Sequence, residues 1–201
     1  MPKIKVIVNE LGQPVGDNYR KFSSAVGCHV RRKLSVACPD WRKVDIKKKM
    51  AVWTDLKEIY DIDDEAFPWF LNAAAKKWKE FKSNLKKQFF YDKLTEQQLR
   101  KIHGERLNDD DWNKLKEYWA SEESEAHTKQ AKANRAKLTI HHTSGSRSFA
   151  CSGHKMGVEL GRPPRRDELY IKTHTRKNGV PLQPAEPIIN KLKSIKNNPR
   201  R

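Results

Sequence analysis

The segment ANRAKLTIHHTSGSRSFA, residues 133–150, concentrates residue types that occur in active sites. A serine nucleophile needs a positioned base and an oxyanion hole. The phrase SGSRS is neither G-x-S-x-G nor a Walker loop, and no strand pattern leads into it. We therefore expect no catalytic residue here. The nucleophiles and bases considered are Ser144, Ser146, Ser148, His141 and His142.

The phrase CSGH places Cys151 and His154 at a spacing that occurs in zinc sites. Structural zinc is usually held by two close pairs of ligands, and a second pair with standard spacing is missing. We expect no metal ion and no cofactor. The alternative is zinc held by Cys151 and His154 together with His141, His142 or His174.

Two acidic clusters, DIDDE at 61–65 and DDD at 109–111, are the candidate ligands for a catalytic metal pair. Both lie at the ends of helical patterns, where carboxylates cap the helix or interact with its dipole. No sheet is predicted that would hold them around metal ions. Helix capping is therefore the preferred interpretation.

Basic residues carry the strongest functional signal of the chain. The net charge is +17 over 201 residues, which favours a polyanionic partner such as nucleic acid. Residues 61–135 hold 15 Lys and Arg against 15 Asp and Glu, whereas residues 136–201 hold 14 against 4. Guanidinium and hydroxyl groups near the SGSRS loop and in GRPPRR are suited to phosphate oxygens. The predicted contacts there are Arg135, Lys137, Arg147, Arg162, Arg165 and Arg166.

Helical periodicity dominates the elements that must position these residues. Phe22, Val26, Val30 and Leu34 predict one stripe on a first helix. A second helix, capped by Asp45, is expected to bury Ile46, Met50, Trp53, Leu56 and Tyr60. The third is expected to bury Phe67, Leu71, Ala74, Trp78, Phe81, Leu85 and Phe89.

In the rest of the chain, capping residues predict where helices begin and end, and the later helices have fewer apolar residues. TEQQ at 95–98 predicts a capping box, Gly104 ends that helix, and NDDDW opens the next one. Beyond Ser121 the helical pattern is polar, residues 139–166 lack periodicity, and EPIINKLKSI predicts a last short helix. The alternation in KIKVIV predicts a strand without an evident partner.

Together these patterns predict a mainly α-helical fold in three segments: a strand and turn at 1–18, a helical domain at 19–135, and a basic, partly irregular tail at 136–201. Its Trp-rich three-helix unit resembles Myb-like and trihelix DNA-binding domains, followed by further helices. In such folds one helix enters the major groove. The contacts predicted on the third helix are Lys76, Lys79, Lys86 and Lys87. Their alternative is an exposed solubilising face.

Three cysteines without a repeated spacing fit a reducing compartment. No apolar run approaches the roughly 20 residues of a membrane span, so we expect no membrane contact. Basic clusters at 31–33, 47–49 and 162–166 favour a nuclear location.

Two long phrases, NRAKLTIHHTSGSRSFA and GRPPRRDELYIKTHTRKNG, resemble the plant transposase family of Ptta and En/Spm (CACTA-type) elements. Upstream, GQPVG, W41-x-x-V44, Trp53, K76-K77-W78 and D111-W112…Y118-W119 are similar to the same family. The resemblance covers about residues 6–195. It implies a role in, or descent from, transposition, of the companion type that binds element DNA while a separate, larger protein cleaves it.

The residues and the resemblance together favour a DNA-binding protein that does not cleave strands itself. Its expected partner is double-stranded DNA, with the catalytic transposase or a second copy of itself as further candidates. The alternative is a protein-interaction module that docks a partner through residues 61–135. A third reading, a nuclease, has the weakest support.

Overall fold

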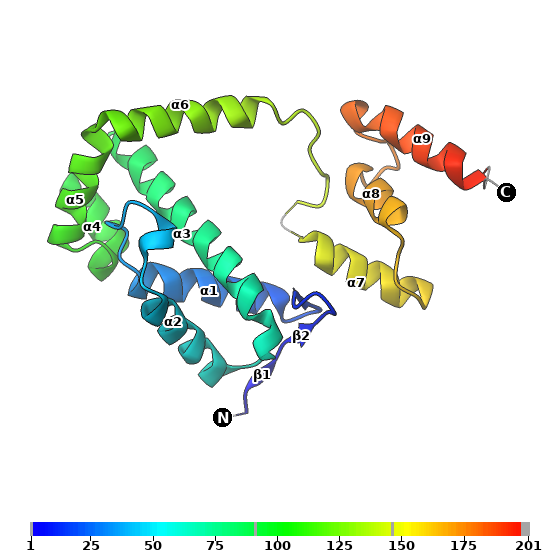
Figure 1. Ribbon diagram of the computed structural model, residues 1–201, viewed down its shortest axis with the longest axis horizontal. Coiled ribbons are helices and arrows are strands. Elements are labelled where there is room, and N and C mark those ends of the chain that lie inside the picture. Colours follow the sequence, from blue (N-terminus) through cyan, green and yellow to red (C-terminus); the bar gives the residue numbers. More distant parts are fainter. Residues whose placement is uncertain (1, 91, 146, 198–201) are drawn as a thin grey trace. The chain divides into compact units, whose positions relative to one another are not determined.

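Helices make up almost all of the regular structure in the computed structural model, which describes residues 2–90, 92–145 and 147–197 (Figure 1). The mainly helical fold class is therefore confirmed. The chain forms two compact units, residues 1–129 and residues 130–201. Among the described residues, no helix is both long and apolar enough to cross a bilayer.

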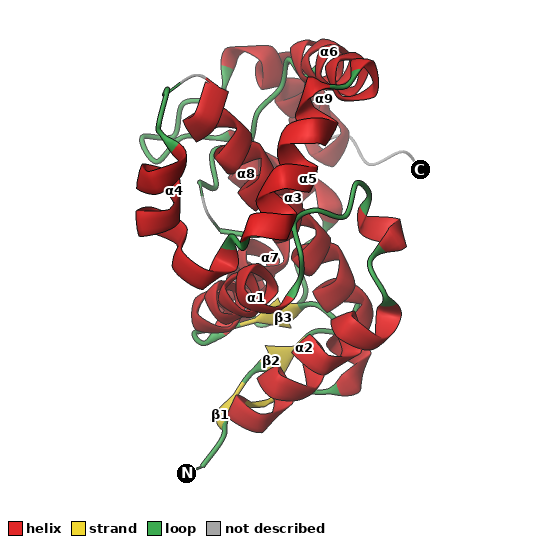
Figure 2. Cartoon of the chain, turned by 90° about the vertical axis from the view of Figure 1, so that its left-hand side faces the viewer, coloured by secondary structure: helices red, strands yellow, loops and turns green. Residues whose placement is uncertain are grey.

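Short strands tie the N-terminus into the first unit. β1 (Ile4–Lys5) pairs in parallel with β4 (Tyr60–Asp61), and β2 (Ile7–Val8) pairs antiparallel with β3 (Pro14–Val15). Figure 1 and Figure 2 both show these short strands next to the start of α1. Val6 and Val15 are both buried. The strand predicted from KIKVIV is therefore present as β1 and β2, and its partner strands were not predicted from the sequence.

α1 (Tyr19–Lys33) and α3 (Phe67–Phe90) form the main helix pair of the first unit. The stripe predicted for α1 is confirmed, because Phe22, Val26, Val30 and Leu34 are all buried. Phe22 packs against the rings of Trp53, Tyr60 and Trp69. On α3 the fully packed positions are Phe70, Ala74, Trp78, Phe81 and Leu85.

α2 (Ile46–Ile59) begins after the Asp45 cap as predicted, but its first turns bury a different face. Ile46 and Met50 are 50% and 52% exposed, so their expected burial was wrong. Lys49 is buried instead. Its Nζ donates to the Trp41 carbonyl at 2.9 Å and lies 4.6 Å from the centre of the Trp41 ring. The aliphatic stem of a lysine can cover apolar surface while its ammonium keeps a polar partner. The first turns of α2 therefore turn Lys49, rather than Ile46 and Met50, toward the core.

Caps define the remaining helices of the first unit. α4 (Glu96–His103) has the predicted Thr95–Gln98 capping box and ends at Gly104, whose φ is 55°. Asn108 caps α5 (Asp109–Ala120), which buries Trp112, Leu115 and Trp119. α6 (Glu122–Ala136) follows, with Ser124 as its buried residue. The unit also holds the short helical turns η1 (Trp41–Lys43), η2 (Asp64–Ala66) and η3 (Gly104–Arg106).

The second unit contains α7 (Phe149–Leu160), α8 (Arg166–His174), η4 (Gln183–Ala185) and α9 (Glu186–Asn197). The prediction that residues 139–166 lack periodic structure was wrong for α7. Ser148 caps this helix by accepting the Cys151 N–H at 3.1 Å. Gly153 and Gly157 face the α8 side, where an added Cβ would lie 3.7 Å from Leu169 and 3.5 Å from the Arg162 carbonyl. The buried residue of α7 is Ser152 rather than an apolar side chain, and the two glycines inside it disfavour helix formation.

Candidate nucleic-acid interface

One exposed face of α3 carries three of the predicted phosphate contacts. Lys76, Lys79 and Lys87 are exposed, on the side away from buried Trp78 and Leu85. Eleven residues separate Lys76 from Lys87, which is about 16 Å along a helix axis. Within the described residues, none of the three forms an ion pair. The face is therefore able to present three ammonium groups to an anion.

Lys86, the fourth lysine predicted on α3, is half-buried. Its Nζ donates to Ser124 Oγ at 2.9 Å and to Thr128 Oγ1 at 3.2 Å, which ties α3 to α6. Lys82, on the same helix, donates to the Cys38 carbonyl at 2.6 Å and lies 4.5 Å from the centre of the Trp78 ring. Burial lowers the pKa of Lys82 to about 8. Sequence spacing did not single out these two internal lysines among the others.

Three more predicted contacts flank the SGSRS loop. Arg135 lies in the last turn of α6, Lys137 follows that helix, and Arg147 precedes the Ser148 cap of α7. All three are exposed, and no carboxylate among the described residues pairs with them. Ser146, considered as a nucleophile, lies outside the described residues.

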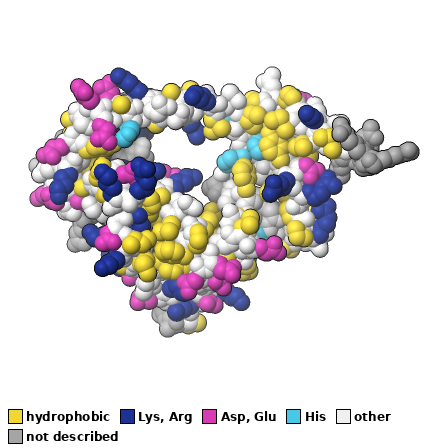
Figure 3. All heavy atoms as spheres, in the orientation of Figure 1, with side chains coloured by type: hydrophobic (Ala, Val, Ile, Leu, Met, Phe, Trp, Pro, Cys, Tyr) yellow, Lys and Arg dark blue, Asp and Glu magenta, His cyan; other side chains and the backbone are white. Residues whose placement is uncertain are grey.

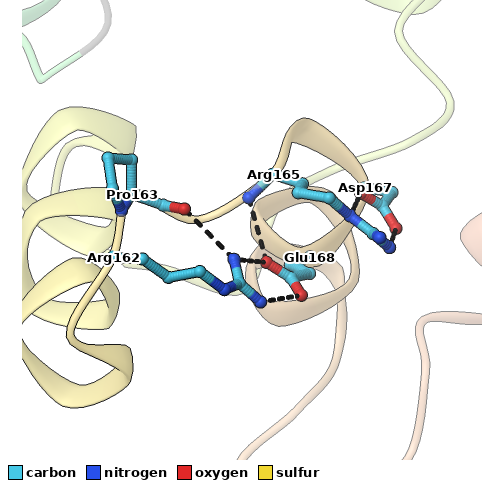
Figure 4. A network of polar contacts seen from close by, with 5 residues as sticks. All are labelled: Arg162, Pro163, Arg165, Asp167 and Glu168. Carbon is cyan, nitrogen blue, oxygen red and sulfur yellow. Dashed lines mark hydrogen bonds and ion pairs between the residues drawn. The ribbon is translucent and has the colours of Figure 1, made fainter.

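Carboxylates already engage two of the three arginines in GRPPRR (Figure 4). Arg162 binds Glu168 through two hydrogen bonds of 2.8 and 3.0 Å, and Arg165 binds Asp167 at 2.6 and 3.0 Å. Glu168 also accepts the Arg165 backbone N–H at 2.9 Å. The Arg162 guanidinium, helped by this backbone bond, lowers the pKa of Glu168 to about 2. Arg166 is exposed and has no ion-pair partner within the described chain.

The two phrases that carried the family resemblance meet inside the second unit. Thr143 donates its N–H to the Thr173 carbonyl at 2.6 Å, and its Oγ1 lies 2.9 and 2.8 Å from the carbonyls of Thr173 and Thr175. These contacts close the SGSRS loop onto the end of α8.

Aromatic rings support the same closure. Phe149 contacts the rings of His142 and His174, at centroid distances of 5.2 and 6.4 Å, and Tyr170 stacks on His174 at 4.0 Å. His142 and His174 therefore have structural contacts. Over the part of the chain that the structure describes, no three His, Cys, Asp or Glu side chains come together as a metal-ligand group.

Net charge differs strongly between the two units. Residues 130–201 contain 16 Lys and Arg against 4 Asp and Glu, whereas residues 1–129 contain 26 against 21. On the face shown in Figure 3, the basic side chains of the first unit are interspersed with acidic ones. The excess positive charge of the protein thus belongs mainly to the second unit.

Comparison with known protein families matches residues 108–199 to the plant transposase family (Ptta/En/Spm). The match begins at the cap of α5 and includes the whole of α7, α8 and α9. The upstream phrases from GQPVG to K76-K77-W78 lie before it. Searches of curated proteins and of solved structures found no match. The part of the chain from Asn108 to residue 199 is thus similar to the plant transposase family of Ptta/En/Spm elements.

Proposed function

We propose that this transposon-derived protein binds double-stranded DNA of its element and acts in transposition without cleaving the strands itself. The observation that carries the proposal is the concentration of positive charge in residues 130–201. Neutralisation of phosphates dominates the affinity of proteins for DNA. A unit with four basic residues for each acidic one is suited to that role.

Ion pairing inside the second unit decides which of its cations are available. Three of its four carboxylates are paired: Glu159 with Lys155, Asp167 with Arg165, and Glu168 with Arg162. Among the predicted contacts of this unit, Arg135, Lys137, Arg147 and Arg166 are left to contact phosphates directly. Arg162 and Arg165 retain N–H groups beyond those that their carboxylates accept, so they make weaker secondary contacts.

The exposed lysines of α3 provide a second candidate surface. Lys76, Lys79 and Lys87 are spaced along one helix face, as in folds whose helix enters the major groove. A helix in that groove fixes the position of the protein through phosphate contacts, and base contacts then add specificity. We propose that α3 contributes sequence preference and that the second unit contributes most of the affinity.

The proposal that the chain does not cleave DNA rests on what its acidic clusters contact. Asp110 pairs with Lys114 at 2.6 Å, Asp111 accepts the Ser35 hydroxyl at 2.7 Å, and Asp109 pairs with Arg100. In the other cluster, Asp64 accepts Lys57 Nζ at 2.6 Å and Trp53 Nε1 at 3.2 Å. These side chains are engaged at helix starts, as capping and dipole interactions favour. A nuclear location follows from the proposal.

Two matched triple variants of the full chain test the DNA surfaces. One replaces Arg135, Lys137 and Arg147 with Gln, and the other replaces Lys76, Lys79 and Lys87 with Gln. Fluorescence anisotropy is measured on a CACTA-type terminal repeat and on a scrambled duplex over a range of salt concentrations. Because each phosphate contact contributes about 0.9 to the salt slope, the first variant is expected to lower the slope by about 2.7 on both duplexes.

The second variant is expected to reduce the preference for the terminal repeat. Equal effects of the two variants on both duplexes would show that only net charge matters. If the unaltered chain does not bind either duplex at low salt, the DNA proposal fails and the alternative, a protein-interaction module using residues 61–135, takes its place. Strand cleavage that requires Mg²⁺ or Mn²⁺ would contradict the non-cleaving role.

A further inference from the structure

α9 displays an apolar stripe that the described part of its own unit leaves partly uncovered. Ile188 and Ile195 are 41% and 59% exposed, and Leu192, between them, is half-buried. The spacings of four and three residues place these side chains on one side of the helix. Ile189, on the neighbouring side, is completely buried. The stripe therefore lies beside the face that holds α9 in its unit.

The geometry of the stripe suits a single helix. At 100° per residue, the three side chains span about 60° of the helix circumference. A core-facing helix usually presents an apolar arc of about 100° or more, and a narrower stripe is typical of a seam with one partner helix. Side chains separated by four and three residues are the anchors by which helices bind one another.

Apolar residues also precede the stripe in the chain. Val180 is 49% exposed, Pro184 is exposed in the segment that leads into α9, and Pro187 is exposed in the first turn of α9. Figure 3 shows hydrophobic side chains gathered around α8 and the start of α9.

The charges beside the stripe select the chemistry of the partner. Lys191 lies next to the stripe, three residues after Ile188 and four before Ile195; it is exposed and pairs with no carboxylate in the described part of the chain. A second copy of this chain would bring the same lysine and a second strongly basic unit to the seam, and like charges at an interface are unfavourable. A helix with glutamates beside its apolar side chains would complement both the apolar stripe and the positive charge next to it.

We propose that the stripe of Ile188, Leu192 and Ile195 is a docking site for an acidic amphipathic helix of another protein. The apolar side chains provide the contact, and Lys191 together with the net positive charge of the unit selects the acidic partner. The three residues of the stripe are not among the predicted DNA contacts.

A designed peptide tests the site in the full chain. The probe has three heptads, with Leu at positions a and d and Glu at e and g; a scrambled peptide of the same composition controls for charge. Ile195→Glu places a carboxylate in the stripe, and Val158→Glu adds the same charge at a 73% exposed position on α7. Ile195→Glu is expected to weaken probe binding at least about tenfold. Val158→Glu is expected to change it less than about twofold.

The remaining outcomes identify other occupants. If both variants weaken probe binding equally, or if the scrambled peptide binds as tightly as the probe, binding depends on charge alone and the docking site is contradicted. Self-association that Ile195→Glu abolishes and Val158→Glu preserves would assign the stripe to a second copy. Binding to vesicles of anionic lipid, with no binding to the probe, would assign it to a membrane surface. DNA affinity is measured for both variants, so failure of this site is distinguishable from failure of the DNA proposal.

Discussion

An arginine in a basic motif is not automatically a phosphate contact. In GRPPRR, Arg162 and Arg165 are held by carboxylates within hydrogen-bond distance, whereas Arg166 is unpaired in the described chain. A paired guanidinium must exchange one anionic partner for another, so its net contribution to DNA binding is smaller than that of an unpaired one. Glu168 is the central residue, because it contacts both Arg162 and the Arg165 backbone.

The ionisation of Glu168 reports this pairing directly. Arg162→Gln is expected to raise the pKa of the Glu168 carboxyl from about 2 toward its ordinary value of 4.5, because the main stabilising donor is lost. Carbon-detected NMR titration of the carboxyl measures the change. The control is Arg166→Gln, which removes the same charge from a neighbouring residue without a carboxylate partner. An equal change in the two variants would contradict the pairing.

The same pKa shift sets the direction of a pH effect. A carboxyl whose pKa is lowered by folding stabilises the folded state above its unfolded pKa and loses that contribution as the pH falls. For Glu168 the loss occurs between pH 4.5 and about 2. Ordering of the α7–α8 turn is therefore expected to weaken over this acidic range, while neutral pH leaves the pair intact.

At the scale of elements, the turn between β2 and β3 shows how tightly the N-terminal segment joins the first unit. Gly12 has a φ of +68°, and a Cβ there would lie 2.3 Å from the Glu65 carbonyl oxygen. Gly16 has a φ of +77°, but a Cβ there would meet only the Ile7 side chain, at 3.5 Å. Residues 9–13 are therefore closely packed against the start of η2.

These glycines form a matched pair for mutation. Gly16→Ala is expected to cost about 1–2 kcal/mol of unfolding free energy, from the left-handed backbone alone. Gly12→Ala adds a backbone clash of about 1–3 kcal/mol. Urea unfolding followed by tryptophan fluorescence measures both, since all six tryptophans lie in residues 1–129. Equal losses in the two variants would show that the Glu65 carbonyl is not a barrier.

The helices that could be predicted from the sequence are those that pack through large apolar side chains at regular spacing. α1 and α3 were found from Phe22, Val26, Trp78 and Leu85, which repeat along one face. The face of α2 was misplaced because Lys49, a residue type normally exposed, takes a buried position over Trp41. α7 was missed because it contains Gly153 and Gly157, a residue type that disfavours helices, and because its buried residue is the polar Ser152.

The sequence predicted which part of the chain carries the basic residues of the candidate interface, but not which residues contact one another there. Charge counts identified the basic C-terminal third. The contact between Thr143 and Thr173 joins residues 30 positions apart, and the bond between Lys86 and Ser124 spans 38. Local periodicity carries no information at such separations, so the sequence did not distinguish internal cations from exposed ones.

At the scale of the molecule, the two units differ in what stabilises them. In the described part of residues 130–201, only the apolar side chains of Ala185 and Ile189 are fully buried, whereas the first unit has an aromatic core. Units of this size rarely gain much stability from one small core. Repulsion among 16 basic residues opposes compaction further. Binding of a polyanion removes that repulsion, so DNA is expected to stabilise the second unit selectively.

Hydrogen exchange of the full chain measures this selectivity. At a duplex concentration of about 100 times Kd, a ligand that binds only the folded state adds about 2.7 kcal/mol, or about a hundredfold slower exchange by unfolding. Amides of α7 and α8 are expected to show this slowing, and amides in the centres of α1 and α3 much less. Heparin, a polyanion without base pairs, is expected to reproduce the effect on α7 and α8. Equal slowing in both units would show that the duplex stabilises the chain as one cooperative body, contrary to an affinity residing mainly in residues 130–201.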